Sequence, residues 1–524
     1  MVALQGQPGN TRPSDNIPYS MPAVPEYFNP TELLLDRHNN KHPDKVAVIA
    51  DGVGYSYSKM TRLVCRAANA LVGFGLEPGD RAMIFSTDSI ESLSMWLGAL
   101  RAGIVPAWIP PAYPSSDLLH FVDEVSPKLL FTDQASKQAE VEAELAKRVK
   151  HIVTEADGYA TQSDTFTPFQ KHRDDICYFF FSGGTTGRSK GVVHLTSDFI
   201  HVPDRHSKFL GWDAKDVHYA TSTKAFTHGI WPGMLIPLYN GASAIITSKK
   251  LSVDIVVEQL QERRPSVLIT VPTVLKWLVV YPDERGKVPD LGSLRMITSA
   301  SEPLPAVIQE KFKKVYGLEI FDSIGSSEIT YEWLSNRPGA NRPGSCGKPI
   351  FGVEVKLMDP AGSGEISEPS RPGELWVKSA TNFLFYWRRA KKSRQTIVGE
   401  WVRTGDVLYF DGDGFFYHTG RTDDLFKVHG MWVSPVDIEK ALLEHGAVRD
   451  AAVVAWQDAD GLTYPKAFVV LGSSTISDEL IGELQEFVRK RLGGYRVPKW
   501  IEALDELPRT ALQKISRASL RKGA

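Results

Sequence analysis

Strand-like apolar runs alternate with segments of helical spacing between residues 46 and 321, and this alternation constrains the fold more than any other feature. The strand-like runs lie at residues 46–50, 81–86, 104–109, 128–132, 266–271, 294–298 and 318–321. Helical spacing follows at residues 58–73, 90–100, 272–278 and 305–316; Ser58 is expected to cap the first helix and Gly317 to end the last. Alternating strands and helices predict α/β layers around largely parallel sheets.

The chain is too long for one hydrophobic core. Its 524 residues predict two or more domains. Short strands separated by glycine turns follow residue 362, and a compact tail with helices at 436–445 and 477–492 and strands at 450–455 and 466–471 follows residue 422. We therefore expect a flexible, proline-rich lead-in (1–25), a large N-terminal domain of α/β layers with a β-rich part (26–422) and a small, mobile C-terminal α+β domain (423–524).

The composition excludes several classes of protein. A net charge of −2 gives no electrostatic case for binding nucleic acid or an acidic membrane. Three widely separated cysteines indicate neither a disulfide framework nor a zinc site, which favours a reducing compartment. No apolar run reaches transmembrane length, and the first residues lack the pattern of a signal peptide. We expect a cytoplasmic protein, with the oligomeric state left open and a homodimer among the options.

Residues 181–191, Phe-Ser-Gly-Gly-Thr-Thr-Gly-Arg-Ser-Lys-Gly, have the composition of a phosphate-binding loop. Glycines let backbone N–H groups approach an anion closely, while Ser182, Thr185 and Thr186 offer hydroxyls and Lys190 a positive charge. Apolar strands are expected at 176–181 and 192–194, so the loop joins two strands and does not fit the usual P-loop pattern. The stretch indicates a nucleoside triphosphate, and a flexible hairpin tip is the alternative.

Further polar groups follow later strands. Two segments, residues 299–302 and 322–328, come directly after predicted strands, where open α/β sheets bind ligands. Glu328 suits a divalent cation held against a phosphate, Asp406 suits ribose hydroxyls, and Arg421 suits a phosphate. Lys514 lies ten residues from the C-terminus. Each has an ordinary alternative: a solvated carboxylate, a Gly-Asp turn, a surface ion pair and a lysine in a basic tail.

Taken together, in this order and spacing, these groups resemble the acyl- and aryl-adenylate-forming superfamily, which includes the AMP-forming acyl-CoA synthetases. The resemblance runs from about residue 28 to residue 520. Residues 224–229, 322–328, 334–339 and 347–349 resemble the benzoate-CoA ligase branch in particular. The resemblance implies an AMP-forming acid–thiol ligase that uses ATP, Mg²⁺ and coenzyme A and acts on a small carboxylic acid through an acyl-adenylate.

The resemblance also implies a role for individual residues. The loop would hold the β- and γ-phosphates with Ser182, Gly183, Gly184, Thr185, Thr186, Gly187 and Lys190. Glu328 would hold Mg²⁺ and Ser327 would touch the α-phosphate; Asp406 and Arg421 would bind the ribose, with Ser301, Glu302 and Asp322 along the adenine. Lys514 would be the catalytic lysine, together with Lys190 and Glu328. Asp423 would be the hinge and Gly430 part of the CoA tunnel.

The sequence says less about the acid-binding pocket and about the positions that depart from the family pattern. By resemblance the pocket is lined by Thr227, His228, Ala300, Gly325, Ile329 and Tyr331, a compact and partly polar set that suits a benzoate-like or other short cyclic acid. Gly183, Ser189 and Gln513 stand where the family usually has serine or threonine, proline and glycine, and Ile324 replaces a common tyrosine. Two alternatives stay open: an enzyme that loads a carrier protein, and a non-catalytic nucleotide-binding homologue.

Overall fold

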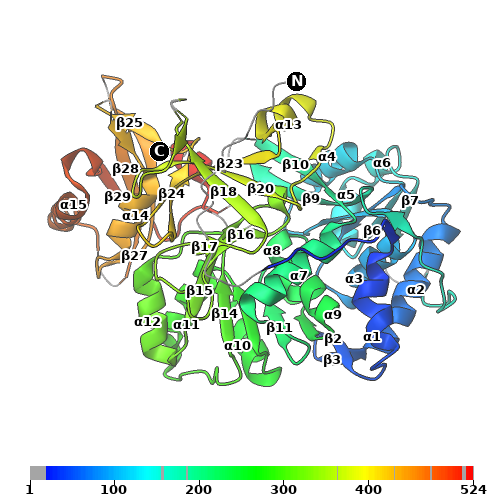
Figure 1. Ribbon diagram of the computed structural model, residues 1–524. Helices are drawn as coiled ribbons and strands as arrows, with labels where there is room; N and C mark the ends of the chain where they lie inside the picture. The colour runs from blue at the N-terminus through cyan, green and yellow to red at the C-terminus, as the bar shows by residue number, and fades with distance from the viewer. Residues whose placement is uncertain are drawn as a thin grey trace, which may run out of the picture.

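The computed structural model describes residues 19–154, 159–184, 187–360, 362, 364–429, 431–458, 460–472, 475–509 and 515–522. Its larger part is built on two sheets that stand side by side, with helices packed against them (Figure 1). The predicted lead-in enters the described region at Tyr19, whose ring stacks on Phe351 with centroids 5.2 Å apart. Its hydroxyl donates to Asp204 over 3.0 Å.

The first sheet has the strand order β21-β10-β9-β5-β4-β6-β7. The strands are β21 (Phe385–Tyr386), β10 (Gly187–Leu195), β9 (Ile176–Gly184), β5 (Val105–Ile109), β4 (Arg81–Phe85), β6 (Leu129–Thr132) and β7 (His151–Thr154). Strands β9, β5, β4, β6 and β7 run parallel, whereas β10 and β21 are antiparallel additions at the edge. The nearby helices are α2 (Tyr57–Gly73), α3 (Ile90–Arg101), α4 (Ser115–Val125), α5 (Ala135–Glu140) and α6 (Glu142–Leu145).

The second sheet has the strand order β17-β16-β15-β14-β13-β11-β12-β2-β3. Its strands are β17 (Lys348–Pro349), β16 (Glu332–Ser335), β15 (Ile320–Gly325), β14 (Met296–Ser299), β13 (Val267–Thr270), β11 (Val217–Ala220), β12 (Ser243–Ile246), β2 (Val46–Ala50) and β3 (Val53–Ser56). The six strands from β15 to β2 are parallel, so their carboxyl ends meet at one edge. Associated with it are α7 (Asp198–Leu210), α8 (Thr227–Ile230), a π-helix (Trp231–Leu235), α9 (Ile236–Asn240), α10 (Val253–Glu262), α11 (Pro272–Arg285) and α12 (Ala306–Tyr316).

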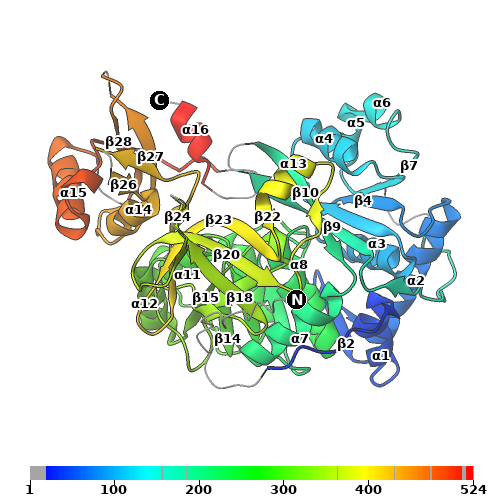
Figure 2. The same ribbon diagram turned by 45° about the horizontal axis from the view of Figure 1, so that its top comes forward.

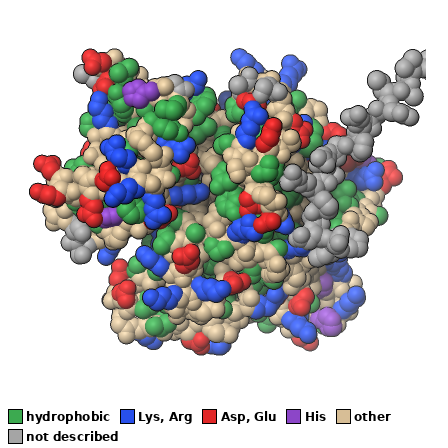
Figure 3. Space-filling model, turned by 60° about the vertical axis from the view of Figure 1, so that its left-hand side comes forward, with side chains coloured by type: hydrophobic (Ala, Val, Ile, Leu, Met, Phe, Trp, Pro, Cys, Tyr) green, Lys and Arg blue, Asp and Glu red, His purple; other side chains and the backbone are tan. Residues whose placement is uncertain are grey.

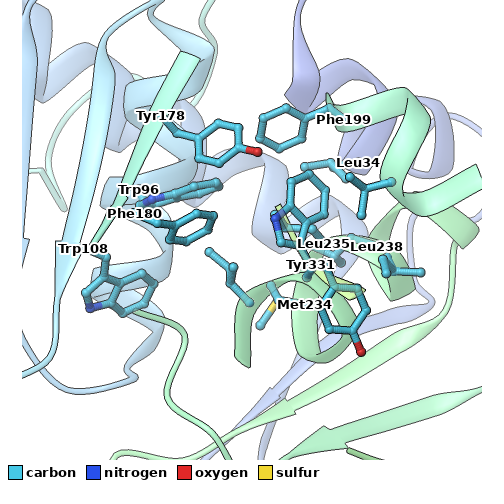
Figure 4. Close-up of a cluster of buried hydrophobic side chains, with 14 of the residues drawn as sticks. Leu34, Trp96, Trp108, Tyr178, Phe180, Phe199, Met234, Leu235, Leu238 and Tyr331 are labelled. Carbon is cyan, nitrogen blue, oxygen red and sulfur yellow. The ribbon is translucent and has the colours of Figure 1, made fainter. Parts of the chain in front are cut away.

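A shared hydrophobic core joins the two sheets. It includes Trp96 of α3 and Tyr178 and Phe180 of β9, with Phe199 of α7 and Trp231 of the π-helix on the other side. Figure 4 shows the rings of Trp96, Tyr178, Phe180 and Phe199 near one another, with Tyr331 at the edge of the cluster and its hydroxyl pointing away from the other labelled side chains. Because the core is continuous, the edges of the two sheets that carry polar groups are held at a fixed separation.

A third, β-rich sheet completes the large domain, and a separate small domain follows it. The third sheet contains β18 (Val353–Met358), β19 (Glu365–Ile366), β20 (Gly373–Ser379), β22 (Ile397–Val398), β23 (Trp401–Phe410) and β24 (Phe416–Arg421), with α13 (Ala390–Thr396) beside it. The small domain contains β25 (Phe426–Val428), β26 (Met431–Val433), α14 (Pro435–Leu443), β27 (Val448–Gln457), β28 (Thr463–Leu471), α15 (Asp478–Leu492), β29 (Trp500–Ala503) and α16 (Arg517–Lys522). It has its own hydrophobic core between the β27-β28-β29 sheet and helices α14 and α15.

The small domain sits beside the large one, and α16 lies on its side that faces the large domain (Figure 2). Acidic and basic side chains are interspersed over the face that Figure 3 shows, as the near-zero net charge leads one to expect. None of the described helices combines the length and the hydrophobicity that crossing a bilayer requires.

The predicted α/β fold class, with a large N-terminal and a small C-terminal domain, is confirmed, and two local predictions are wrong. The first long helix is capped by Ser56 and not by Ser58: the Ser56 hydroxyl accepts a hydrogen bond from the Lys59 amide at 3.2 Å. The predicted strand at 318–321 runs instead from Ile320 to Gly325, because Asp322 pairs with Ser299 of β14 and Ser323 with Ser335 of β16. Asp322 is therefore a strand residue.

Candidate active site

The glycine-rich stretch forms the end of a β-hairpin, as its sequence predicts. Strands β9 and β10 pair antiparallel, and Ser182 lies opposite Lys190 in the register. The Ser182 hydroxyl is buried and has no hydrogen-bond partner among the described residues. Thr185 and Thr186 lie outside the described residues, and of Gly183, Gly184 and Gly187 the structure describes the backbone in the two strands. The hairpin thus directs a free hydroxyl and a lysine to one place.

Lys190, Tyr386 and Glu328 lie next to one another. The Lys190 ammonium sits over the Tyr386 ring, 4.8 Å from its centroid, and the Tyr386 hydroxyl donates to Oε1 of Glu328 at 2.7 Å. Tyr386 reaches this position because β21 pairs with β10, the second strand of the hairpin. Burial lowers the pKa of Lys190, while the Glu328 carboxylate opposes the shift. No carboxylate of the described residues lies within 4 Å of this ammonium, so its charge is available to an anion.

A buried network holds the turn that carries Glu328. Glu328 belongs to a short 3₁₀ helix, Ser327–Ile329. Nε2 of His194 donates to the Ser327 carbonyl at 2.7 Å, and Nδ1 of His194 lies 3.0 Å from Asp198. Asp198 also accepts hydrogen bonds from Tyr178 and Thr330. The hairpin strands and α7 thereby position Glu328, and the sequence analysis missed these supporting residues.

Two residues at the site have backbones in the left-handed region. Ser301 follows β14 with φ of 78°, and Thr330 follows the Glu328 turn with φ of 75°. This conformation is strained for a β-branched residue such as threonine. The Thr330 hydroxyl donates to Asp198 and to the Thr381 carbonyl, each at 3.0–3.1 Å, which offsets the strain. The backbone at both strand ends is therefore tightly determined.

Asp406 and Arg421 form a pair across β23 and β24. They are register partners, and Nη1 of Arg421 donates to Oδ1 of Asp406 at 3.0 Å. His418 lies 3.2 Å from the same oxygen. The Asp406 carboxylate raises the pKa of the Arg421 guanidinium, which therefore stays charged. The surface ion pair that the sequence offered as an alternative is instead a pair with a mostly buried carboxylate.

Asp322, Ser301 and Glu302 lie at the carboxyl ends of neighbouring parallel strands. Asp322 is buried, its Oδ1 has no hydrogen-bond partner among the described residues, and burial raises its pKa well above the usual range. Glu302 is engaged: the Thr273 hydroxyl donates to its Oε2 at 2.9 Å. The two carboxyl groups therefore differ, one being an unused buried acceptor and the other part of a contact network.

Of the residues expected to line the acid pocket, five are buried and Gly325 is half-buried, and some of them lie in mutual contact. His228 and Tyr331 have ring centroids 6.3 Å apart, and the Gly325 backbone approaches the Tyr331 carbonyl so closely that a Cβ would come within 2.2 Å of it. The Ser222 hydroxyl lies 3.0 Å from Nδ1 of His228. Thr227, Ala300 and Ile329 are also buried. Glycine is required at position 325 because any side chain would collide with the backbone of the neighbouring strand.

The two domains meet through charged residues close to the expected catalytic lysine. Asp450 of β27 accepts hydrogen bonds from Lys276 of α11 and from Arg509, both at 2.9 Å. Nη1 of Arg509 lies 3.7 Å from Oε1 of Glu302 in the large domain. Lys514 lies outside the described residues, but Arg509 and Ile515 on either side of it form a β-bridge. Arg509 and Ile515, the described residues on either side of 510–514, therefore lie side by side.

The two remaining site predictions fall at the beginning of the small domain. Asp423 lies in an exposed turn between β24 and β25, next to Asp424, which is buried. Gly430 lies outside the described residues, between β25 and β26. The turn at Asp423 connects the pair Asp406–Arg421 directly to the first strand of the small domain.

Comparisons with known proteins agree with this architecture. The model of the AMP-binding enzyme family matches residues 35–387, and that of the AMP-binding enzyme C-terminal domain matches residues 437–514. The chain is 33% identical over 522 residues to a benzoate–CoA ligase of Thauera aromatica, covering 95% of this chain and 96% of that protein.

Solved structures show the same likeness. A benzoate CoA ligase from Burkholderia xenovorans LB400 has a TM-score of 0.87 at 32% identity, covering 94% of this chain and 100% of that one. An anthranilate CoA ligase in complex with anthranoyl-AMP has a TM-score of 0.91 at 31% identity, covering 96% and 98%. The resemblance to the adenylate-forming superfamily is confirmed, and the chain belongs to the AMP-binding enzyme family.

Proposed function

We propose that this enzyme joins a short cyclic, benzoate-like carboxylic acid to coenzyme A, with ATP cleaved to AMP and pyrophosphate. The observation that carries the proposal is that Lys190 and Glu328 lie beside the Ser182 hairpin, and that Arg421, paired with Asp406, is close enough to interact electrostatically with both. The likeness to benzoate and anthranilate CoA ligases over nearly the whole chain supports the same reaction.

The chemistry explains why cations must gather at this place. A carboxylate is a poor acylating agent because its leaving group would be an oxide. If a carboxylate oxygen attacks the α-phosphorus of ATP, pyrophosphate leaves and the acyl-adenylate has AMP as its leaving group. Two anions must approach each other and charge grows on the phosphate oxygens, so positioned cations supply most of the stabilisation.

The residues present fit ATP. Ser182 offers an unpaired hydroxyl and Lys190 an ammonium to the β- and γ-phosphates. Asp406 and Arg421 suit the ribose, and the unpaired Oδ1 of Asp322, with Ser301 and Glu302 at neighbouring strand ends, suits the adenine side. Ser327 precedes Glu328 in the turn and would contact the α-phosphate. Lys514 would bridge the acid and the α-phosphate.

Mg²⁺ would be held by Glu328 together with phosphate oxygens. The described residues contain no group of three or more potential metal ligands, which is consistent with a cation that uses one carboxylate and its substrate's phosphates. Tyr386 leaves Oε2 of Glu328 for this purpose, since its hydroxyl bonds Oε1. The cation supplies charge neutralisation of the departing pyrophosphate.

The second half-reaction requires a change of domain orientation. Coenzyme A must reach the acyl carbonyl at the place where Lys514 acts in the first step. Lys514 must therefore leave before the thiol can enter, which a rotation of the small domain allows. We assign the hinge to Asp423, in the exposed turn after Arg421, and a place in the CoA tunnel to Gly430. We also propose that the reaction takes place in the cytoplasm, as expected from the sequence.

A panel of acids tests the proposed function. Pyrophosphate release is measured with benzoates, alicyclic acids and fatty acids, with and without coenzyme A. Because the residues around His228 and Tyr331 are compact, kcat/KM should favour ring acids over octanoate or longer chains by at least about tenfold. Equal or better use of long fatty acids would contradict the ring-acid assignment. Thioester formation only with a carrier protein would exclude free coenzyme A as the acceptor.

A further inference from the structure

Glu332, the first residue of β16, is a buried carboxyl group that the chemistry above does not use. Its side chain is 1% exposed. The Ser323 hydroxyl donates to Oε1 at 2.6 Å, whereas Oε2 has no hydrogen-bond partner among the described residues. A buried carboxyl oxygen without a partner is unfavourable, so such groups usually meet a water molecule or a ligand.

The register of the sheet places this carboxyl beside the acid pocket. Glu332 is the partner of Gly325 in the antiparallel pair β15–β16, so both residues share one face of the sheet. Gly325 has no side chain to cover that face. The Ser323 hydroxyl oxygen also lies 2.9 Å from the carbonyl oxygen of Ser299, the residue before Ala300. Glu332 therefore lies among residues expected to contact the acid.

The groups around Glu332 favour a hydrogen-bond acceptor at this point. Burial raises the pKa of Glu332 to about 7, and the Ser323 hydroxyl, the neighbouring Tyr331 hydroxyl and the Arg205 guanidinium oppose the rise. Arg205 is 3% exposed; its Nη1 donates to Ser379 at 2.7 Å, and no carboxylate of the described residues lies within 4 Å of it. A nearby cation that forms no ion pair favours the ionised, accepting form of the carboxyl without occupying Oε2.

Tyr331 lies on the same side of the substrate pocket. It is buried, and burial together with the Glu332 carboxylate raises its pKa well above the usual range, so it stays a neutral phenol. Its ring lies between those of His206 and His228, with centroids 4.7 Å and 6.3 Å away. The Tyr331 hydroxyl lies close enough to Glu332 to interact with it, so a ring substituent would compete with this hydroxyl for Oε2.

We propose that Oε2 of Glu332 accepts a hydrogen bond from an amino or hydroxyl substituent on the ring of the acid, and that Glu332 thereby sets a preference for donor-substituted ring acids over unsubstituted ones. This inference rests on the proposed function. Amino and hydroxyl groups both carry a hydrogen that they can donate. The position of the group on the ring decides whether it can reach the Glu332 carboxyl.

The test compares kcat/KM for acid-dependent pyrophosphate release between benzoate and its 2-, 3- and 4-hydroxy, amino and methoxy derivatives. The unmodified enzyme should favour at least one hydroxybenzoate or aminobenzoate over benzoate by about tenfold to a hundredfold. This is the range expected for a hydrogen bond to a charged group. The methoxy acid of the same position, which has no donor, should not be favoured. Comparing the hydroxybenzoate and the aminobenzoate substituted at that position shows which donor the site prefers.

Two substitutions assign the preference to Glu332. Glu332→Leu should abolish it while retaining turnover of benzoate, and Glu332→Gln, which keeps an acceptor oxygen, should retain part of it. Glu374→Gln is the matched control, because Glu374 is equally buried but is engaged by Arg403 in the third sheet, and it should leave the preference unchanged. Thermal unfolding of each variant shows whether it is folded.

Three results would overturn the inference. The first is no preference for any donor-substituted acid in an enzyme that uses benzoate. The second is a preference that survives Glu332→Leu. The third is a change in thermal stability with an unchanged ratio of kcat/KM values, which would assign Oε2 to a structural water molecule. The proposed function fails separately, if no ring acid is adenylated at all.

Discussion

Replacing Lys514 with alanine is expected to slow acid-dependent pyrophosphate release by about 10²- to 10³-fold, the usual effect of removing one preorganised charge from an electrostatically stabilised transition state. The same variant should convert a supplied acyl-adenylate and coenzyme A to thioester at nearly the unmodified rate. The reason is that the lysine is needed where the carboxylate meets the α-phosphate and not where the thiol attacks.

The residues on either side of this segment lie close to the large domain. The bridge between Arg509 and Ile515 fixes both ends of the segment that carries Lys514, and Arg509 lies against Glu302 of the large domain. Lys490→Ala removes an exposed lysine on α15 and serves as the control, which should keep both half-reactions. An equal loss of both half-reactions in Lys514→Ala would show that the lysine does not act in adenylation alone.

Replacing Asp423 with proline is expected to separate the two half-reactions in the opposite way. Proline fixes φ near −65° at a position that we expect to rotate, so one domain orientation should be trapped. In the orientation seen here Lys276 pairs with Asp450 and Arg509 lies against Glu302 across the interface, and we expect this orientation to be the adenylating one. Asp423→Pro should therefore form acyl-adenylate at a rate close to normal and transfer it to coenzyme A at least about tenfold more slowly.

Asp423→Ala is the matched control for the hinge, since it removes the same exposed carboxylate and leaves the backbone free. It should support both half-reactions. Single-turnover measurements of adenylate formation and of thioester formation separate the two steps. If Asp423→Pro transferred the acyl group as fast as Asp423→Ala, rotation about this residue would not be part of the mechanism.

The order of strands and helices could be predicted from the sequence because it depends on local patterns. The strands β2 and β5 are apolar over their whole length, β4 and β13 are apolar except for one end residue each, and Gly317 ends α12 in the left-handed conformation, with φ of 73°. The sequence predicts the capping residues of helices and the ends of strands less accurately. Ser56 and Ser58 are both suitable caps, and only the backbone extended at Ser56 lets its hydroxyl reach the Lys59 amide.

The supporting residues of the candidate site could not be predicted, because tertiary contacts create them. His194 and Asp198 meet Ser327 and Thr330 only after the hairpin, α7 and the Glu328 turn have packed together. Glu332 gave no signal in the sequence, where an acidic residue between Tyr331 and Trp333 would ordinarily be exposed. The antiparallel pairing of β16 with β15 turns it inward. Sequence patterns do not predict which charged residues are buried by the pairing of strands.

The central claim is that this enzyme activates an acid by attack of its carboxylate on the α-phosphorus of ATP. The most direct measurement uses a ring acid labelled with ¹⁸O in both carboxylate oxygens and follows the label by mass spectrometry after turnover with ATP, Mg²⁺ and coenzyme A. We predict that one ¹⁸O atom appears in each AMP and none in pyrophosphate. Unlabelled AMP, or ADP and phosphate as products, would contradict the account.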